Sequence, residues 1–230
     1  MHTISVIVPV FNEEDNVVAT INVIANVLTR NTADWEIIAI DDGSADGSYT
    51  ILKSVSETLP GRMIVLRHPV NRGPGRAFAT GFERARGDII VTLDADMTYH
   101  PSQIPILLSA INEFDIVIGS PFLLASKENY SSRLFVSRLA SLGYSILSGT
   151  RLTCYTGFFR AYKADTIKHM RIECDGYEAQ AEILIKAIRS NFRVGEVPVQ
   201  LTSRVGGRSK FKYYREVSRH AKLIARLSVS

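Results

Sequence analysis

Short apolar runs alternate with longer amphipathic segments along the first half of the chain. The runs are continuous and rich in β-branched residues, a pattern typical of strands buried on both faces of a parallel sheet. They predict strands over residues 3–8, 36–40, 63–66 and 88–93, with helices between them over 14–28, 46–57 and 76–86. This order predicts an α/β protein with a Rossmann-like, mostly parallel central sheet flanked by helices.

The second half of the chain is less regular. Helices are predicted over residues 101–112, 131–147, 176–188 and 213–227, and strands over 115–118, 155–162 and 193–199. Pro198 cannot donate to a sheet ladder, so the last of these strands is expected at an edge. The C-terminal helix is amphipathic and basic. We expect it either to lie on an anionic membrane or to pack on the domain with its basic side in solvent.

Acidic side chains stand where the predicted strands end. Asp94 and Asp96 follow the fourth strand, and the remaining acids end the second strand or follow the first: Asp41, Asp42 and Glu13. The carboxyl ends of parallel strands meet at one edge of a sheet, the usual place for a ligand. Carboxylate oxygens suit Mg²⁺ or Mn²⁺ holding a diphosphate. A bare D-x-D is short and common, however, and its acids also serve to end a strand and begin a helix.

The composition and charge limit the kinds of partner that the protein is expected to have. The 230 residues suit one domain, and 27 basic against 23 acidic residues give a net charge of +4, with the basic excess gathered over 189–226. The positive electrostatic field of this basic excess would attract phosphates. The basic residues follow no nucleic-acid-binding module, so no nucleic acid partner is expected. Neither a signal peptide nor a spanning apolar run is evident. We expect a cytoplasmic protein, peripheral on the cytoplasmic face of a membrane.

Four motifs occur in order along the first half: Val8-Pro9-Val10-Phe11-Asn12-Glu13, Asp41-Asp42-Gly43-Ser44, Asn71-Arg72-Gly73 and Leu93-Asp94-Ala95-Asp96. Together they resemble the nucleotide-sugar half of an inverting family 2 glycosyltransferase with the GT-A fold. Three later segments resemble the dolichol-phosphate mannose synthase and polyprenyl-phosphate glycosyltransferase group: Cys154–Arg160 (CYTGFFR), Gly176–Glu182 (GYEAQAE), and Glu196–Val199 (EVPV) with Arg204, Gly207, Ser209 and Lys210.

The resemblance implies metal-dependent, inverting transfer of a sugar, mannose or glucose, from a GDP- or UDP-linked donor to a polyprenyl phosphate at a membrane surface. It implies one domain over 1–230, with a nucleotide-sugar half (1–100), an acceptor half (101–210) and an amphipathic helix (211–230). The residues expected to bind the nucleotide sugar are Pro9, Phe11, Glu13, Ala39, Asp41, Asp42, Asp94, Ala95, Asp96, Arg204 and Lys210. Asp94 and Asp96 would hold the metal, and Arg133, Arg138 and Arg160 the acceptor phosphate.

The catalytic residues implied are Asp94, Asp96, Glu182 and Arg138. A phosphate monoester is already largely anionic near neutral pH, so it needs positioning rather than a strong base. Glu182 is then expected to position arginine side chains. Two alternatives stay open: transfer to a glycan hydroxyl, with Glu182 as the base, and a non-catalytic nucleotide- or membrane-binding module. The intact Asp94 and Asp96 count against the second.

Some residues also have a purely structural interpretation. Phe11 would serve as core, Asp42 as a turn former, and Glu13 as an acid favoured by a helix dipole. The chain also departs from the group at three places: Pro121 stands for an arginine, Cys154 for an aspartate, and Met97–His100 for Leu-Gln-His-Pro. These departures leave the sugar and the acceptor open.

Overall fold

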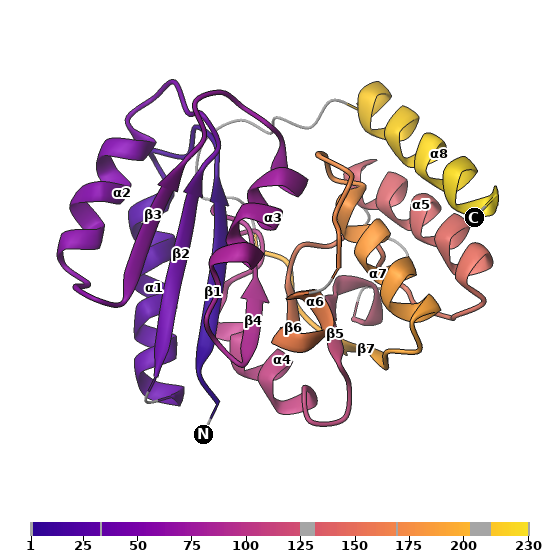
Figure 1. Ribbon diagram of the computed structural model, residues 1–230, viewed down its shortest axis with the longest axis horizontal. Coiled ribbons are helices and arrows are strands. Elements are labelled where there is room, and N and C mark those ends of the chain that lie inside the picture. The colour runs from indigo at the N-terminus through magenta and orange to yellow at the C-terminus, as the bar shows by residue number, and fades with distance from the viewer. Residues whose placement is uncertain (1, 33, 125–131, 169, 203–212, 230) are drawn as a thin grey trace.

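A single mixed sheet forms the centre of the protein. The computed structural model describes residues 2–32, 34–124, 132–168, 170–202 and 213–229 (Figure 1). Within these residues the sheet has seven strands in the order β3-β2-β1-β4-β6-β5-β7. In chain order the strands are β1 (Ile4–Val10), β2 (Trp35–Asp41), β3 (Met63–Arg67), β4 (Ile89–Thr92), β5 (Ile116–Ser120), β6 (Arg160–Lys163) and β7 (Val194–Pro198).

The strands from the first half of the chain are all parallel to one another. β1 lies between β2 and β4, with Val10 opposite Asp41 and Ile7 opposite Thr92. β6 runs antiparallel to both β4 and β5, and β7 pairs in parallel with β5. The predicted mostly parallel α/β sheet is therefore confirmed. Pro198 lies in β7 at the sheet edge, as its missing N–H predicts.

Helices cover both faces of the sheet (Figure 1). One face carries α1 (Val17–Asn31), α2 (Ser48–Glu57) and α4 (Ile104–Ala110), which follows the 3₁₀ turn η1 (Pro101–Gln103). The other carries α3 (Pro74–Arg84), α6 (Ala164–Lys168) and α7 (Ala179–Arg189). α5 (Ser132–Ser148) packs on α7, and α8 (Tyr213–Val229) packs on α5. A second 3₁₀ turn, η2 (Pro121–Leu123), follows β5.

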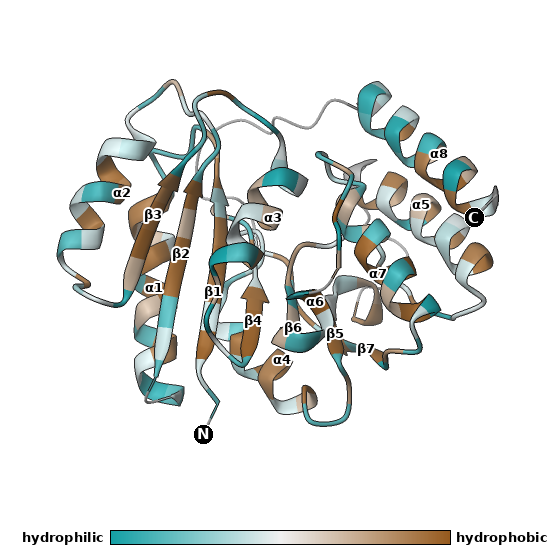
Figure 2. Ribbon diagram, in the orientation of Figure 1, coloured by the Kyte–Doolittle hydropathy of each residue, from teal (hydrophilic) through white to brown (hydrophobic). Residues whose placement is uncertain are grey.

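Two hydrophobic clusters, one on each face, explain the continuous apolar runs. Along β2, Ile37 enters one cluster and Ile38 the other, and both are fully buried. β1, β3 and β4 are accordingly hydrophobic along most of their length in Figure 2. Burial on both faces removes the apolar–polar alternation that a half-exposed strand would show.

The strand predicted over 155–162 is only partly correct. The strand is β6, Arg160–Lys163, and residues 153–159 form an irregular connection. Its aromatic residues Tyr155, Phe158 and Phe159 are buried from this connection, so the aromatic content that favoured a strand reflects core packing. The short helix α6 was not predicted.

α8 uses its apolar side inside the protein. Leu223 and Leu227 are buried, and the Arg189 guanidinium donates to the Leu227 carbonyl at 2.6 Å. On the neighbouring α5, the Tyr144 hydroxyl meets Nδ1 of His220 at 2.8 Å. α8 therefore packs on the domain through this side. Contact of its basic side with a membrane stays a prediction.

Candidate active site

The predicted acids gather at the carboxyl-terminal edge of adjacent strands. β2, β1 and β4 are neighbours in the sheet. They end at Asp41, Val10 and Thr92, so the acids that follow them emerge at the same edge. β1, between the other two, is where the strand order reverses direction, which is the usual ligand crevice of an open α/β sheet.

The turn around Asp94 and Asp96 is held from two sides. From α1, the Thr20 hydroxyl donates to the Ala95 carbonyl at 2.8 Å. From the other side, the Thr202 hydroxyl donates to the Met97 carbonyl, and the Thr202 N–H donates to the Thr98 carbonyl at 2.9 Å. Ala95 is buried and contributes packing, and its carbonyl is the anchored group.

The backbone at Met97 is left-handed, with φ +62°. A non-glycine residue persists in this region only where its surroundings determine it, and such positions cluster at functional sites. Just before it, Asp96 is largely buried, and its Oδ1 accepts the Thr98 N–H at 3.0 Å. The turn is therefore rigid before any ligand arrives.

The two carboxylates fit a hard divalent cation. Asp94 is half-buried and Asp96 keeps little exposure. Among the described residues, no three His, Cys, Asp or Glu side chains gather as a metal site of their own. Mg²⁺ commonly binds one or two carboxylates and takes its other ligands from water and substrate phosphates. The residues present thus fit a cation that arrives together with a diphosphate.

The loop after β1 is fastened to the turn before α2. The Asn12 N–H donates to Oγ of Ser44 at 2.9 Å, and the Ala45 N–H donates to Oδ1 of Asn12 at 2.8 Å. The Glu13 N–H donates to Oγ of Ser48 at 2.8 Å. These bonds hold the chain directly after Phe11 and place the loop beside the turn that follows β2.

Three predicted nucleoside contacts come from β1 and this loop. Glu13 is nearly buried, and its Oε2 accepts from Nδ2 of Asn16 at 2.9 Å. Pro9 and Phe11 are half-buried. Phe11 is not among the side chains of the two core clusters that the described residues form. The contact of Phe11 with the nucleoside stays a prediction.

Asp41 is a buried carboxylate at the end of β2. Nε of Arg67 lies 3.1 Å from its Oδ2, without the alignment of a hydrogen bond. Neither carboxylate oxygen accepts a hydrogen bond from the described residues. Because buried acceptors are normally satisfied, Asp41 retains the capacity to accept from a ligand. Ala39, two residues earlier, is fully buried in the core and contributes packing, and its predicted ligand contact stays a prediction.

Asp42 is occupied by the protein itself. It is buried and accepts from Nδ1 of His68 at 2.6 Å, from the Arg72 N–H at 3.0 Å and from the Gly73 N–H at 2.8 Å. Nε2 of His68 in turn lies 3.0 Å from Oγ1 of Thr80. Asp42 therefore shapes the loop before α3, as the turn-former interpretation holds. His68 was missed because a lone histidine gives no pattern.

Gly73 shows how closely that loop approaches the second half of the chain. Its φ is +94°, and a Cβ there would lie 2.3 Å from the Asp175 carbonyl oxygen. The same carbonyl accepts the Gly75 N–H at 2.8 Å. Only glycine allows this conformation and this contact together.

Arg138 is exposed on α5 near the end of β5. Its Nη1 donates to the Thr153 carbonyl at 3.0 Å, and its guanidinium lies 5.3 Å from the centre of the Phe122 ring. A guanidinium has several N–H donors, so one carbonyl does not exhaust it. The side chain of Arg133 on the same helix lies outside the described residues.

The position of Arg160 counts against its predicted contact with the acceptor phosphate, because the side chain has a structural role. It is fully buried, with Nη1 donating to the Gln180 carbonyl at 2.7 Å and Nη2 to the Tyr155 carbonyl at 2.6 Å. The arginine opens β6, and its guanidinium ties the connection before that strand to α7. Arg204 and Lys210 lie outside the described residues.

Glu182 is fully buried in α7 and surrounded by donors. It accepts from the Cys174 N–H at 2.8 Å, from Nζ of Lys186 at 2.8 Å and from the Arg226 guanidinium at 3.2 Å. Burial alone would raise the pKa of its carboxyl, but these bonds outweigh burial and hold the pKa below its ordinary value. This geometry favours the predicted positioning role over that of a base, and the role of Glu182 stays a prediction.

Cys154 is also buried, where the resembled group has aspartate. Burial raises the pKa of its thiol to about 11. The thiol therefore stays protonated near neutral pH and acts in packing rather than as a nucleophile.

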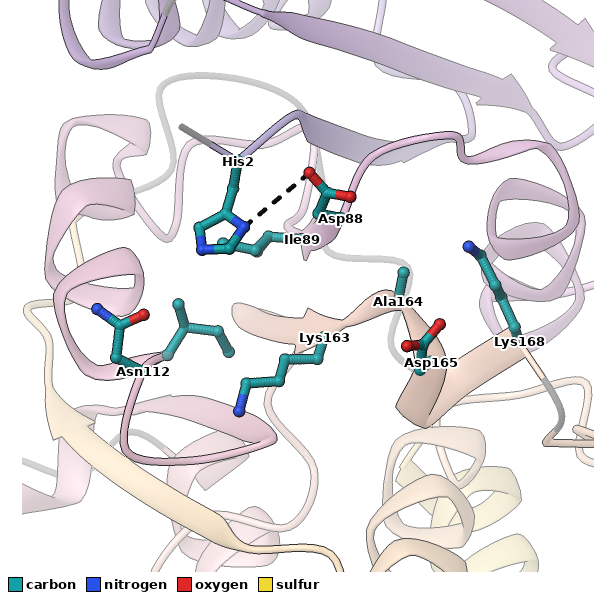
Figure 3. Close-up of a pocket in the computed structure, with 9 residues that line it drawn as sticks. His2, Asp88, Ile89, Asn112, Lys163, Ala164, Asp165 and Lys168 are labelled. Carbon is teal, nitrogen blue, oxygen red and sulfur yellow. Dashed lines mark ion pairs between the residues drawn. The ribbon is translucent and has the colours of Figure 1, made fainter.

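A pocket of about 400 Å³ lies away from these acids (Figure 3). His2, Asp88, Asn112 and Lys163 are among its lining residues, and Nδ1 of His2 lies 4.0 Å from Oδ2 of Asp88. Asp88 directly precedes β4, so this pocket stands at the amino-terminal edge of the parallel strands. It shares no residue with the candidate active site.

A mostly parallel sheet with an acidic edge at its strand ends is the fold of the GT-A class, as a solved structure shows. The solved structure of glucosyl-3-phosphoglycerate synthase from Mycobacterium tuberculosis, in complex with Mn²⁺, UDP and phosphoglyceric acid, has the same fold. The TM-score is 0.73 at 19% identity, over 98% of this chain and 77% of that chain. The family model for glycosyl transferase family 2 matches residues 5–171. The chain belongs to glycosyl transferase family 2.

Two curated relatives match nearly the whole chain. An undecaprenyl-phosphate mannosyltransferase of Micrococcus luteus is 32% identical over 89% of this chain and 85% of its own length. An undecaprenyl-phosphate 4-deoxy-4-formamido-L-arabinose transferase of Pseudomonas fluorescens is 27% identical over 95% of this chain, which spans 63% of that relative. These relatives confirm the resemblance to the polyprenyl-phosphate glycosyltransferase group. Among the described residues no helix is long and apolar enough to cross a bilayer.

Proposed function

We propose that the protein transfers a hexose, mannose or glucose, with inversion from a GDP- or UDP-linked donor to a polyprenyl phosphate. The observation that carries this is the anchored turn bearing Asp94 and Asp96, at the same sheet edge as the Asp41 carboxylate, which is paired with Arg67 but accepts no hydrogen bond from the described residues. The family and the printed names of the relatives support the reaction class.

The donor half would bind the nucleotide through residues at the ends of β1 and β2. Phe11 would stack on the base or ribose, while Asp41 accepts hydrogen bonds from base N–H or ribose hydroxyl groups. Asp94 and Asp96 would hold Mg²⁺ or Mn²⁺, which when bound takes up the charge of the departing diphosphate. Arg204 and Lys210, which follow the anchored Thr202 in the chain, are proposed to contact the same diphosphate.

The acceptor half would position a nucleophile that is already charged. Arg138, with Arg133, would hold the lipid phosphate so that one oxygen lies in line with the anomeric carbon. Since that oxygen attacks the face opposite the diphosphate, the configuration inverts. Buried Glu182 favours a phosphate over a glycan hydroxyl, because a hydroxyl acceptor needs a carboxylate base within reach.

We also propose that α5 meets the bilayer. Its outer side carries four exposed apolar residues at helical spacing: Phe135 (64%), Leu139 (61%), Leu142 (58%) and Ile146 (77%). Arg138 follows Phe135 by three residues and precedes Leu142 by four on the same helix, so the stripe borders the proposed phosphate contact. A lipid surface is the occupant that supplies both apolar chains and phosphates. The protein has two free cysteines, which suit a membrane contact on the cytoplasmic, reducing side.

The membrane surface can be tested by flotation with anionic liposomes. Replacing both Leu139 and Ile146 with glutamine is expected to release most of the protein, because each buried side chain of this size contributes about 1.5–3 kcal/mol. Ile106→Gln changes an exposed residue of α4, on the other face of the sheet, and is expected to float like the wild type. Undiminished flotation of the double variant would rule out α5 as the membrane contact.

The reaction itself can be tested by screening nucleotide sugars against a polyprenyl phosphate and reading lipid-linked product by mass. We expect product with one GDP- or UDP-linked hexose, lost on chelation and restored by Mg²⁺ or Mn²⁺. A parallel assay with soluble sugars in place of the lipid phosphate is expected to give none. Product on soluble sugars alone would overturn the lipid acceptor.

A further inference from the structure

Glu196 organises a hydrogen-bonded cluster beside Arg138. It lies in edge strand β7, and its carboxylate accepts three hydrogen bonds from the connection before β6. The Thr153 N–H donates to Oε2 at 2.7 Å, while the Cys154 N–H and the Thr153 hydroxyl donate to Oε1 at 2.8 and 3.0 Å. Glu196 thus fixes the turn whose carbonyl, that of Thr153, receives Arg138.

The second support of Arg138 also depends on this carboxylate. A hydroxyl has one proton to donate, and that of Thr153 goes to Glu196. The Ser120 hydroxyl, 2.7 Å away, must therefore donate to Thr153. Oγ of Ser120 then accepts the Phe122 N–H at 3.3 Å. Phe122 carries the ring over which the Arg138 guanidinium lies.

From this arrangement we infer that Glu196 is a positioning residue for the acceptor phosphate. Through Thr153 it fixes the carbonyl that holds Arg138, and through Ser120 it fixes the residue whose ring supports the guanidinium. A guanidinium binds a phosphate best when its donors are directed in advance. The inference rests on the proposed function, because it assumes that Arg138 meets the acceptor.

The test measures KM for a polyprenyl phosphate in phosphatidylglycerol vesicles, KM for the nucleotide sugar, and kcat, with the full chain. Glu196→Gln replaces one acceptor oxygen with a donor. It is expected to raise KM for the lipid phosphate about tenfold, the order of one lost hydrogen bond to a charged group. KM for the nucleotide sugar should not change. Thr153→Val, which removes only the hydroxyl link, is expected to raise the same KM by less.

A double-mutant cycle separates positioning from general loosening. If Glu196 acts through Arg138, Glu196→Gln has little further effect in an Arg138→Gln background. Asp115→Asn is the matched control, because Asp115 also accepts a backbone N–H of the β7 segment, that of Arg193 at 2.9 Å, but at its far end. This control is expected to lower stability and leave both KM values unchanged.

The outcomes separate the inference from the function on which it rests. If the wild type makes no lipid-linked sugar with any donor, the proposed function fails, whatever the variants do. If the wild type is active and Glu196→Gln keeps its KM for the lipid phosphate, the positioning role alone is wrong. Additive effects of Glu196→Gln and Arg138→Gln would overturn it in the same way.

Discussion

Replacing Asp96 with asparagine is expected to lower sugar transfer by about three orders of magnitude, because a cation at a departing diphosphate supplies several kcal/mol of charge stabilisation. The amide keeps the size of the side chain and an oxygen for the Thr98 N–H. The turn also keeps its contacts to Thr20 and Thr202. The loss should therefore be chemical rather than structural.

Calorimetry with GDP or UDP, with and without Mn²⁺, checks the origin of that loss. The wild type is expected to bind the diphosphate more tightly with Mn²⁺, and Asp96→Asn to lose most of this gain. Asp88→Asn is the control, since Asp88 precedes the same strand at its opposite end and accepts the Thr3 N–H there. An Asp96→Asn variant with the full Mn²⁺ effect would exclude this carboxylate from the metal site.

Replacing Glu182 with alanine is expected to destabilise the protein by about 3–5 kcal/mol, the usual result of removing one partner from a buried ion pair. Lys186 and Arg226 would lose their common acceptor, and the Cys174 N–H its carboxylate. Urea unfolding followed by circular dichroism measures the change. Glu182→Gln, which keeps part of the hydrogen bonding, is expected to lose less stability.

The contribution of Glu182 to the stability of the fold is expected to decrease at low pH. The pKa of Glu182 in the folded protein lies below its ordinary value of 4.5. Its contribution to stability is therefore complete above about 4.5 and is lost as the pH falls through the folded-state pKa. In Glu182→Gln this part of the acid sensitivity should disappear, while folded protein keeps its turnover on lipid phosphate. A folded, stable variant without turnover would instead identify Glu182 as a base.

The acidic edge of the sheet was predictable from the sequence. The contacts that each charged side chain makes there were not. Parallel strands end at one edge, so Asp41 and Asp94 had to emerge near each other once the strands were identified. A motif does not say how far its side chain is buried. Arg160 looked like a phosphate ligand, but it opens a strand that runs against its neighbours, and its donors turn inward to two carbonyls.

Amphipathic patterns were similarly limited. The sequence left open whether the C-terminal helix α8 lies on a membrane or packs on the domain, and it did not show which apolar side chains of α5 stay exposed. In the fold, Leu223 and Leu227 are buried, whereas Leu139 and Ile146 remain outside. Helical spacing defines an apolar side, but only the tertiary arrangement determines what covers it.

The unsatisfied carboxylate of Asp41 has a consequence for discrimination between nucleobases. An ionised carboxylate only accepts hydrogen bonds, and both of its oxygens lie buried without a hydrogen-bond donor from the described residues. A base whose ring nitrogen carries a hydrogen, as in uracil or guanine, would donate a hydrogen bond to this carboxylate. Adenine and cytosine present a lone pair at the equivalent position, and two facing acceptors out of water repel. A contact between Asp41, which also pairs with Arg67, and this ring nitrogen would therefore favour UDP- and GDP-linked donors over ADP- and CDP-linked ones.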